Sequence, residues 1–166
     1  MALAAKPAGR AAARPVSKQR LRLWLRLLLA RRAIEAELRE RLRVQFAITL
    51  PQFDVMAALA RKDDGITMTE LSRALMVSNG NVTGIIDRLS SRQYVARQAS
   101  AKDRRRFIVR LTPKGQAQFS IIAKAHEEWV DELLSGFKPE EAETVVTKFE
   151  NLNATILDHS QPDGED

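Results

Sequence analysis

The sequence predicts a mainly α-helical fold with a small β-hairpin, and three observations support this class. Apolar residues recur at spacings of three and four over most of the 166 residues, which is the helical period. Two short helical stretches, 69–75 and 78–89, are separated by a tight turn. Residues 106–111 then alternate between polar and apolar side chains after a run of cations, as expected for a strand that follows a basic hairpin tip. This order of elements is that of a winged helix-turn-helix.

The chain is expected to divide into five segments. Two are tails: residues 1–17 are small, basic and interrupted by prolines, and residues 160–166 are mostly polar, which predicts a flexible basic tail and a disordered tail. Residues 18–50 form a long helix, residues 51–112 the winged helix-turn-helix, and residues 113–159 two further helices. The first helix is apolar on more than one side, which a single small domain rarely covers. The helices at both ends are therefore predicted to be dimerisation helices.

The helices inside these segments have recognisable starts. Pro51 opens a helix that continues to Ala60. Thr69 is expected to cap the next helix and Ser78 the one after it. The predicted core positions of these two helices are Leu71, Ala74 and Leu75, and then Val82, Ile85, Ile86 and Leu89. Thr112-Pro113 begins a long helix, and the last helix carries an apolar side of Ala142, Val145, Phe149, Leu152 and Ile156.

Charge is distributed unevenly along the chain. Residues 1–115 hold 24 Lys and Arg against 9 Asp and Glu, whereas residues 116–166 hold 3 against 12. A basic region gains affinity for polyanions by releasing counterions, so the first part is expected to face nucleic acid. Two oppositely charged surfaces that pair with each other are the alternative interpretation.

Several classes of protein are not expected. Cysteine is absent, which excludes disulfides and thiolate metal sites, and His126 and His159 have no metal-ligand spacing. There is no cysteine nucleophile and no glycine-rich phosphate loop, so we predict no enzyme activity, no metal and no cofactor. The apolar stretch 21–30 is short and interrupted by Arg22 and Arg26, which predicts a cytoplasmic protein without a membrane partner.

The second helix of the helix-turn-helix has the residues of a DNA-reading helix. Its N-terminal half lacks bulky groups, so its backbone can approach base edges, and we expect Ser78, Asn79, Asn81 and Thr83 to contact DNA. Arg88, two turns after Asn81, is expected to hold the phosphate backbone. A simple loop between helices is the alternative, but the apolar spacing continues through this stretch.

The hairpin tip is expected to contact the minor groove. Strand alternation predicts that Phe107, Val109 and Leu111 face inward, whereas Arg106, Ile108 and Arg110 face outward. Arg104, Arg105 and Arg106 are candidates for insertion into the narrow minor groove, with Asp103 orienting the Arg105 guanidinium. A solvated turn without DNA contacts is the alternative. A helix for the major groove beside this tip predicts double-stranded DNA as the partner.

These motifs together resemble a known family of regulators. The segments that carry the resemblance are Thr69-Glu70-Leu71, Val77-Ser78, Val82-Thr83, Asp87-Arg88-Leu89, Arg97, Asp103-Arg104-Arg105 and Val109 to Gly115. The pattern is similar to the multiple antibiotic resistance regulator (MarR) family. The resemblance implies a homodimeric transcription factor, usually a repressor, that a small ligand releases from a pseudo-palindromic operator. Members commonly have glycine where this chain has Gln93, which calls the geometry of that turn into question.

The resemblance also implies an effector pocket between the dimerisation helices and the DNA-binding domain. Its candidate residues are aromatic, apolar or cationic: Trp24, Arg26, Leu27, Arg31, Arg32, Phe53, Met56, His126 and Trp129. Such a set suits an aromatic carboxylate or, given the many arginines, an aromatic acyl-CoA such as p-coumaroyl-CoA, as in the hydroxycinnamoyl-CoA-responsive branch. The same tryptophans and histidine also fit a plain core, and the arginines a dimer or DNA surface. A ligand-independent architectural DNA-binding protein and a peripheral membrane protein are the rival functions.

Overall fold

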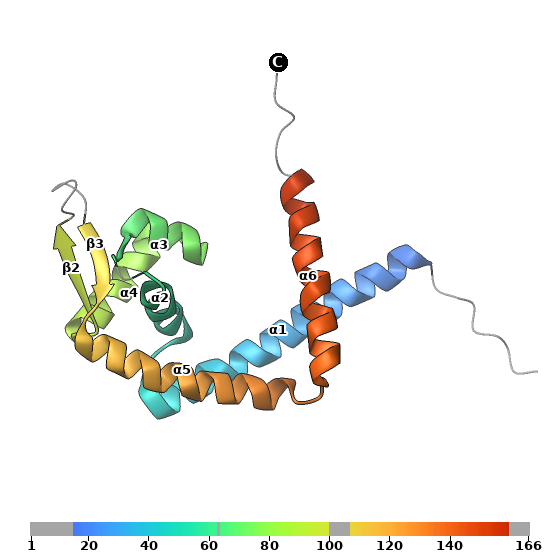
Figure 1. Cartoon of the computed structure of the whole chain (residues 1–166), viewed down its shortest axis with the longest axis horizontal. Coiled ribbons are helices and arrows are strands. Elements are labelled where there is room, and N and C mark those ends of the chain that lie inside the picture. The colour runs from blue at the N-terminus through green and yellow to red at the C-terminus, as the bar shows by residue number, and fades with distance from the viewer. Residues whose placement is uncertain (1–14, 63, 100–106, 160–166) are drawn as a thin grey trace, which may run out of the picture. The chain divides into compact units, whose positions relative to one another are not determined.

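The computed structural model describes residues 15–62, 64–99 and 107–159. Within them the chain forms six helices and three strands, in an order that Figure 1 follows by colour. The elements are α1 (Val16–Phe46), α2 (Leu50–Ala60), β1 (Ile66–Thr67), α3 (Met68–Leu75), α4 (Asn79–Ser91), β2 (Val95–Ala99), β3 (Phe107–Leu111), α5 (Pro113–Leu134) and α6 (Pro139–His159). The predicted class, mainly helical with a small β wing, is confirmed.

The wing has one strand more than the sequence predicts. Strand β3 lies in the middle of an antiparallel sheet of order β1-β3-β2. Its partner β2 runs in register from Val95 opposite Leu111 to Ala99 opposite Phe107, as the predicted hairpin requires. On its other side, Ile66 of β1 lies opposite Val109. A strand of two residues is too short to show an alternating pattern, which explains why the sequence gives no sign of it.

The chain divides into two compact units, of which the first ends at Leu50 and the second begins at Pro51. In the first unit, α1 is supported by ion pairs one turn apart: Glu35 accepts from Arg31 at 2.7 Å and from Arg39 at 2.9 Å. Its buried residues are Leu38 and Leu42, both in the second half of the helix. The first half instead exposes large apolar side chains, among them Leu21 and Trp24, each 56% exposed.

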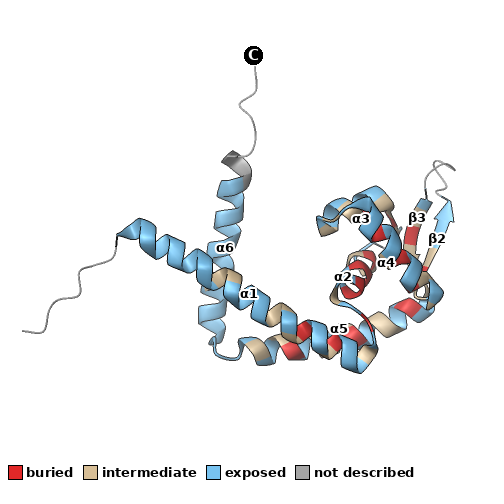
Figure 2. Ribbon diagram, turned by 180° about the vertical axis from the view of Figure 1, so that it is seen from behind, coloured by how far each residue is buried: buried red, intermediate tan, exposed pale blue. Residues whose placement is uncertain are grey.

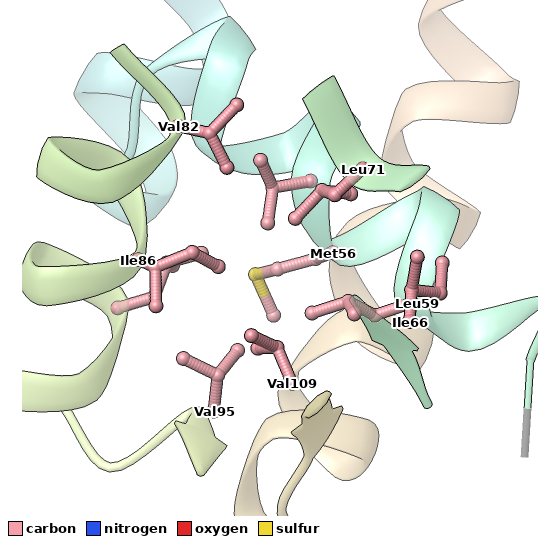
Figure 3. Packing of buried hydrophobic residues seen from close by; sticks show 10 residues of the cluster. Met56, Leu59, Ile66, Leu71, Val82, Ile86, Val95 and Val109 are labelled. Atoms are coloured by element: carbon pink, nitrogen blue, oxygen red, sulfur yellow. The ribbon is translucent and has the colours of Figure 1, made fainter. Parts of the chain in front are cut away.

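The second unit has a core built by α2, α3, α4 and the sheet. Figure 3 shows Met56 of α2 surrounded by side chains from these elements. The buried cluster consists of Val55, Met56, Leu59, Ile66, Leu71, Val82, Ile86, Leu89, Val95 and Val109. The predicted inward face of α4 is thus confirmed at Val82, Ile86 and Leu89, with Ile85 half-buried. In α3 only Leu71 is fully buried, and the prediction that Ala74 is a core residue is wrong.

Three side-chain caps fix where the helices of this unit begin. Thr67, not Thr69, caps α3: its hydroxyl accepts from the Glu70 N–H at 3.3 Å, while Glu70 accepts from the Thr67 N–H at 2.9 Å. This reciprocal capping box starts the helix two residues earlier than expected. Ser78 caps α4 as predicted. Thr112 caps α5, whose first residue is Pro113.

Helix α6 has almost no cover within the chain. Figure 2 shows it pale blue along most of its length, and between Pro139 and Ile156 none of its residues is buried. Its apolar side chains Phe149, Leu152 and Ile156 are 37%, 47% and 52% exposed. A helix with an uncovered apolar stripe is poorly stable by itself in water. This surface therefore needs a partner.

Candidate nucleic-acid interface

Helix α4 presents a polar face opposite its buried side. Val82, Ile86 and Leu89 anchor the helix in the core. The five residues predicted to contact DNA from this helix are all exposed: Ser78, Asn79, Asn81, Thr83 and Arg88. Two of them also hold the helix start, because Ser78 Oγ accepts from the Asn81 N–H at 3.4 Å and Thr83 Oγ1 donates to the Asn79 carbonyl at 3.0 Å. Their contacts with DNA remain predictions.

Two glycines leave the backbone of α4 bare on the same side. A Cβ added at Gly80 or at Gly84 would meet nothing within 4 Å. Gly80, Gly84 and Asp87 follow one another at spacings of four and three, so they share one line along the helix. Neither glycine is needed for packing. Gly80 and Gly84 instead leave a strip of the α4 backbone that another molecule can approach closely.

An ion pair joins α4 to the wing. Nη2 of Arg97 on β2 donates to Oδ1 of Asp87 at 2.6 Å. The two side chains are 39% and 58% exposed, so the pair contributes only about 0.2–1 kcal/mol to stability. Its larger effect is geometric, because it holds a cation of the wing beside the exposed face of α4. Both residues belong to the motif segments of the sequence, but their pairing depends on the fold because they are ten residues apart.

The wing differs from the simple alternating prediction. Val109 is fully buried and Leu111 half-buried, as expected, but Phe107 is 56% exposed and its predicted inward position is wrong. Phe107 pairs with Ala99 at the end of the ladder, outside the buried cluster of described residues, which leaves its side chain largely exposed. The predicted tip contacts of Arg104, Arg105 and Arg106, and the orienting role of Asp103, lie outside the described residues.

The turn after α4 is fixed by residues from the start of α5. Gln93 adopts a left-handed conformation with φ 63°, the backbone geometry for which glycine is favoured. Its carbonyl accepts from Thr112 Oγ1 at 2.6 Å, and Nζ of Lys114 donates to the Arg92 carbonyl at 3.0 Å. A Cβ at Gly115 would overlap the Tyr94 carbonyl oxygen, so α5 and the turn are in backbone contact. The departure from glycine at 93 therefore leaves the turn intact.

Only part of the expected effector set comes together within one unit. In the second unit the Phe53 ring stacks on His126 with centroids 4.4 Å apart, and burial lowers the pKa of His126. Met56 has no exposed surface and Trp129 is 8% exposed, so both lie in cores. In the first unit, Leu27 of α1 is half-buried, whereas four other expected contacts are exposed: Trp24, Arg26, Arg31 and Arg32.

The described residues show neither a metal site nor a membrane span. They contain no group of three His, Cys, Asp or Glu side chains that could hold a metal ion. No described helix is long and apolar enough to cross a bilayer. A helix-turn-helix with a polar, uncrowded second helix and an antiparallel wing beside it defines a winged helix-turn-helix DNA-binding protein.

Comparison with known proteins specifies the family. A family model described as the MarR family matches residues 48–106. The transcriptional regulator MhqR of Bacillus subtilis is 26% identical over 141 residues, which cover 84% of this chain and 96% of MhqR. A MarR family regulator from Silicibacter pomeroyi, solved by crystallography, is 30% identical, with a TM-score of 0.73 and coverage of 86% of this chain and 99% of its own.

A third relative was solved together with DNA. It is a mutant MarR of E. coli complexed with operator DNA, 25% identical, with a TM-score of 0.70 and coverage of 84% of this chain and 99% of its own. The chain therefore belongs to the MarR family of DNA-binding transcription regulators. Proteins of this fold and family are regulators of transcription, not enzymes.

Proposed function

We propose that the protein is a homodimeric, effector-responsive repressor that binds a pseudo-palindromic operator. The observation that carries the proposal is the exposed face of α4, where short polar side chains and bare glycine backbone lie opposite a fully buried apolar side. Side chains of this kind can hydrogen-bond base edges in the major groove. Ser78, Asn79, Asn81 and Thr83 would then contact bases, Arg88 the phosphates, and the wing-tip arginines the minor groove.

Dimerisation is supported by the apolar surface that the chain leaves uncovered. Helix α6 exposes Phe149, Leu152 and Ile156, and the first half of α1 exposes Leu21 and Trp24. Covering such surfaces with a second copy buries them symmetrically. Two copies would place two α4 helices on half-sites about 34–36 Å apart, which explains why a pseudo-palindromic operator is expected. In this proposal residues 18–50 and 113–159 serve dimerisation, and residues 51–112 serve DNA binding.

The effector is proposed to be an aromatic carboxylate or an aromatic acyl-CoA such as p-coumaroyl-CoA. The half-buried His126 ring, stacked on the buried Phe53 ring, offers an aromatic surface, and the first half of α1 carries exposed Trp24, Arg26 and Arg32. An effector that prefers the conformation unable to bind DNA by about 3 kcal/mol lowers operator affinity roughly 150-fold. A change in the separation of the two α4 helices is enough, because the half-site spacing is fixed by the DNA.

Footprinting on the DNA upstream of the chain's own coding region tests this function. We expect compact, two-fold protection that aromatic acids or their CoA esters remove, and a dimer by light scattering. Asn81→Ala should abolish the preference for operator over scrambled DNA, whereas Ser120→Ala on the exposed surface of α5 serves as the matched control. Diffuse protection of every duplex would instead favour a ligand-independent architectural protein. A monomer in solution would contradict the dimer.

A further inference from the structure

We infer that a cavity at the base of the wing binds a small organic anion. The cavity lies within the second unit and has a volume of about 370 Å³. Four elements or their ends line it: the end of α2, strands β2 and β3, and the first turn of α5. Its polar lining comes from Lys62, Gln98, Arg110 and Gln116, and its apolar lining includes Leu59 and Leu111. None of its lining residues belongs to the set proposed above for the effector, and its regulatory consequence rests on the proposed function.

The described lining of the cavity carries positive charge and no negative charge. None of the described lining residues is acidic, and two of them are cations; Asp63, which follows Lys62, lies outside the described residues. Nε of Arg110 donates to the Asp64 carbonyl at 2.9 Å, but among the described residues its two terminal nitrogens have no partner. The same holds, within that part of the chain, for the Lys62 ammonium and for the side-chain amides of Gln98 and Gln116. A guanidinium and an ammonium that line the same cavity can together bind a carboxylate.

A specialised turn holds Arg110 in place and includes the backbone of Lys62. Gly65 has a φ of 79°, and a Cβ there would lie 2.6 Å from Arg110 Cγ and 2.8 Å from the Val109 carbonyl oxygen. The stem of Arg110 therefore rests directly on glycine backbone, which no other residue would permit. The same turn is closed by the Gly65 N–H donating to the Lys62 carbonyl at 2.9 Å. Because Arg110 is fixed before the anion arrives, little side-chain entropy is lost on binding.

The volume selects the size of the anion. Pockets for small organic ligands span about 300–1,000 Å³, so this cavity is at the lower end of that range. It fits a carboxylate with one ring, whose apolar part can contact Leu59 and Leu111. Its volume is too small to enclose a whole CoA thioester. The cavity thus favours the free aromatic acid over the thioester as its occupant.

Occupation of the cavity would act on the wing. The lining joins both hairpin strands to the start of α5, and α5 in turn holds the turn that follows α4. An anion that binds one arrangement of these elements better than another shifts the population toward it. We expect the anion to favour an arrangement in which the wing and α4 no longer fit the DNA together, so that operator affinity falls.

Calorimetric titration of the full-length protein tests the site. The probes are benzoate, p-coumarate and p-coumaroyl-CoA, and the variants are Lys62→Gln, Arg110→Gln and the cavity-filling Ala96→Phe. Arg61→Gln is the matched control, because it removes the same charge one residue away from a lining residue. We expect the wild type and Arg61→Gln to bind benzoate equally, and the three cavity variants to bind it at least tenfold more weakly, with Lys62→Gln retaining its affinity for DNA.

Two results would overturn the inference. One is the absence of heat with both benzoate and p-coumarate; the other is equal benzoate affinity in the wild type and in Lys62→Gln and Ala96→Phe. The proposed repressor function is tested separately. If the protein binds no duplex specifically while Lys62→Gln still weakens benzoate binding, the anion site is supported and the repressor function is contradicted.

Discussion

Gly84 lies in the interior of α4, on the side opposite the residues that anchor this helix, and its replacement by alanine separates stability from DNA affinity. Glycine in an exposed helix interior is less favourable than alanine by about 1 kcal/mol. Packing does not explain why glycine stands here despite its lower helix stability, because a Cβ at Gly84 meets nothing within 4 Å. We therefore expect Gly84→Ala to stabilise the free protein by about 1 kcal/mol, which is roughly 2–4 °C in Tm for a chain of this size.

The affinity for DNA should change in the opposite direction. The new methyl group would project from the same line as Gly80 and Asp87, between helix backbone and the floor of the major groove. Displacing one bidentate base contact costs about 1–3 kcal/mol, which corresponds to a roughly 5- to 150-fold rise in Kd. The predicted signature is thus a more stable protein that binds its operator less tightly.

Thermal unfolding followed by circular dichroism measures the first effect, and fluorescence anisotropy with labelled operator at one fixed salt concentration measures the second. Gly136→Ala is the matched control, since a Cβ there also meets nothing within 4 Å and Gly136 lies in the turn between α5 and α6, outside α4. The control should bind operator as the wild type does. If Gly84→Ala is more stable and binds operator with unchanged affinity, close approach of the α4 backbone is not the reason for glycine.

Three further predictions concern the second unit. Gly115→Ala should destabilise by about 3 kcal/mol or more in urea unfolding, because its Cβ would overlap the Tyr94 carbonyl; a wild-type midpoint would contradict this. Gln93→Gly should raise the free energy of unfolding in the same measurement by about 1 kcal/mol, because glycine adopts φ 63° without steric penalty, and a lower free energy would count against it. Burial lowers the pKa of His126, so the unfolded chain binds its proton more readily. The free energy of unfolding should therefore be highest above about pH 6.5 and fall as the pH drops through the pKa of the folded state. His126→Phe should flatten this dependence. Parallel curves of unfolding free energy against pH for the wild type and the variant would refute the prediction.

Periodic features of the fold could be predicted from the sequence, whereas single contacts could not. The inward side of α4 follows from the spacing of Val82, Ile86 and Leu89, because that spacing reports which side of a helix is apolar. The start of α3 was misplaced by two residues, although the sequence carried the signal. Thr67, and not Thr69, stands three residues before Glu70, as a capping box requires.

Strand alternation predicts the face of a side chain but not whether anything covers it. Phe107 and Val109 point to the same face of β3, yet Val109 is fully buried and Phe107 is 56% exposed. The difference lies in the extent of the core below the sheet, which depends on where α4 ends and β2 begins. The ion pair between Asp87 and Arg97 could not be predicted from the sequence either. It depends on how far strand β2 lies from helix α4, and no local sequence pattern encodes that distance.

The two chemical forms of the proposed effector make different demands on charge, and the chain meets them in different places. Residues 16–34 contain six Lys and Arg and no Asp or Glu, although Arg31 is neutralised by Glu35. A CoA thioester carries several phosphate charges, so it would be drawn to this exposed stretch through long-range attraction that salt screens. A single carboxylate needs only one fixed guanidinium and one ammonium, which Arg110 and Lys62 supply. The Asp64 carbonyl and the turn at Gly65 fix Arg110 before the carboxylate binds. Binding of the carboxylate should therefore depend on hydrogen-bond geometry more than on long-range attraction, and it should depend less on salt than binding of the thioester.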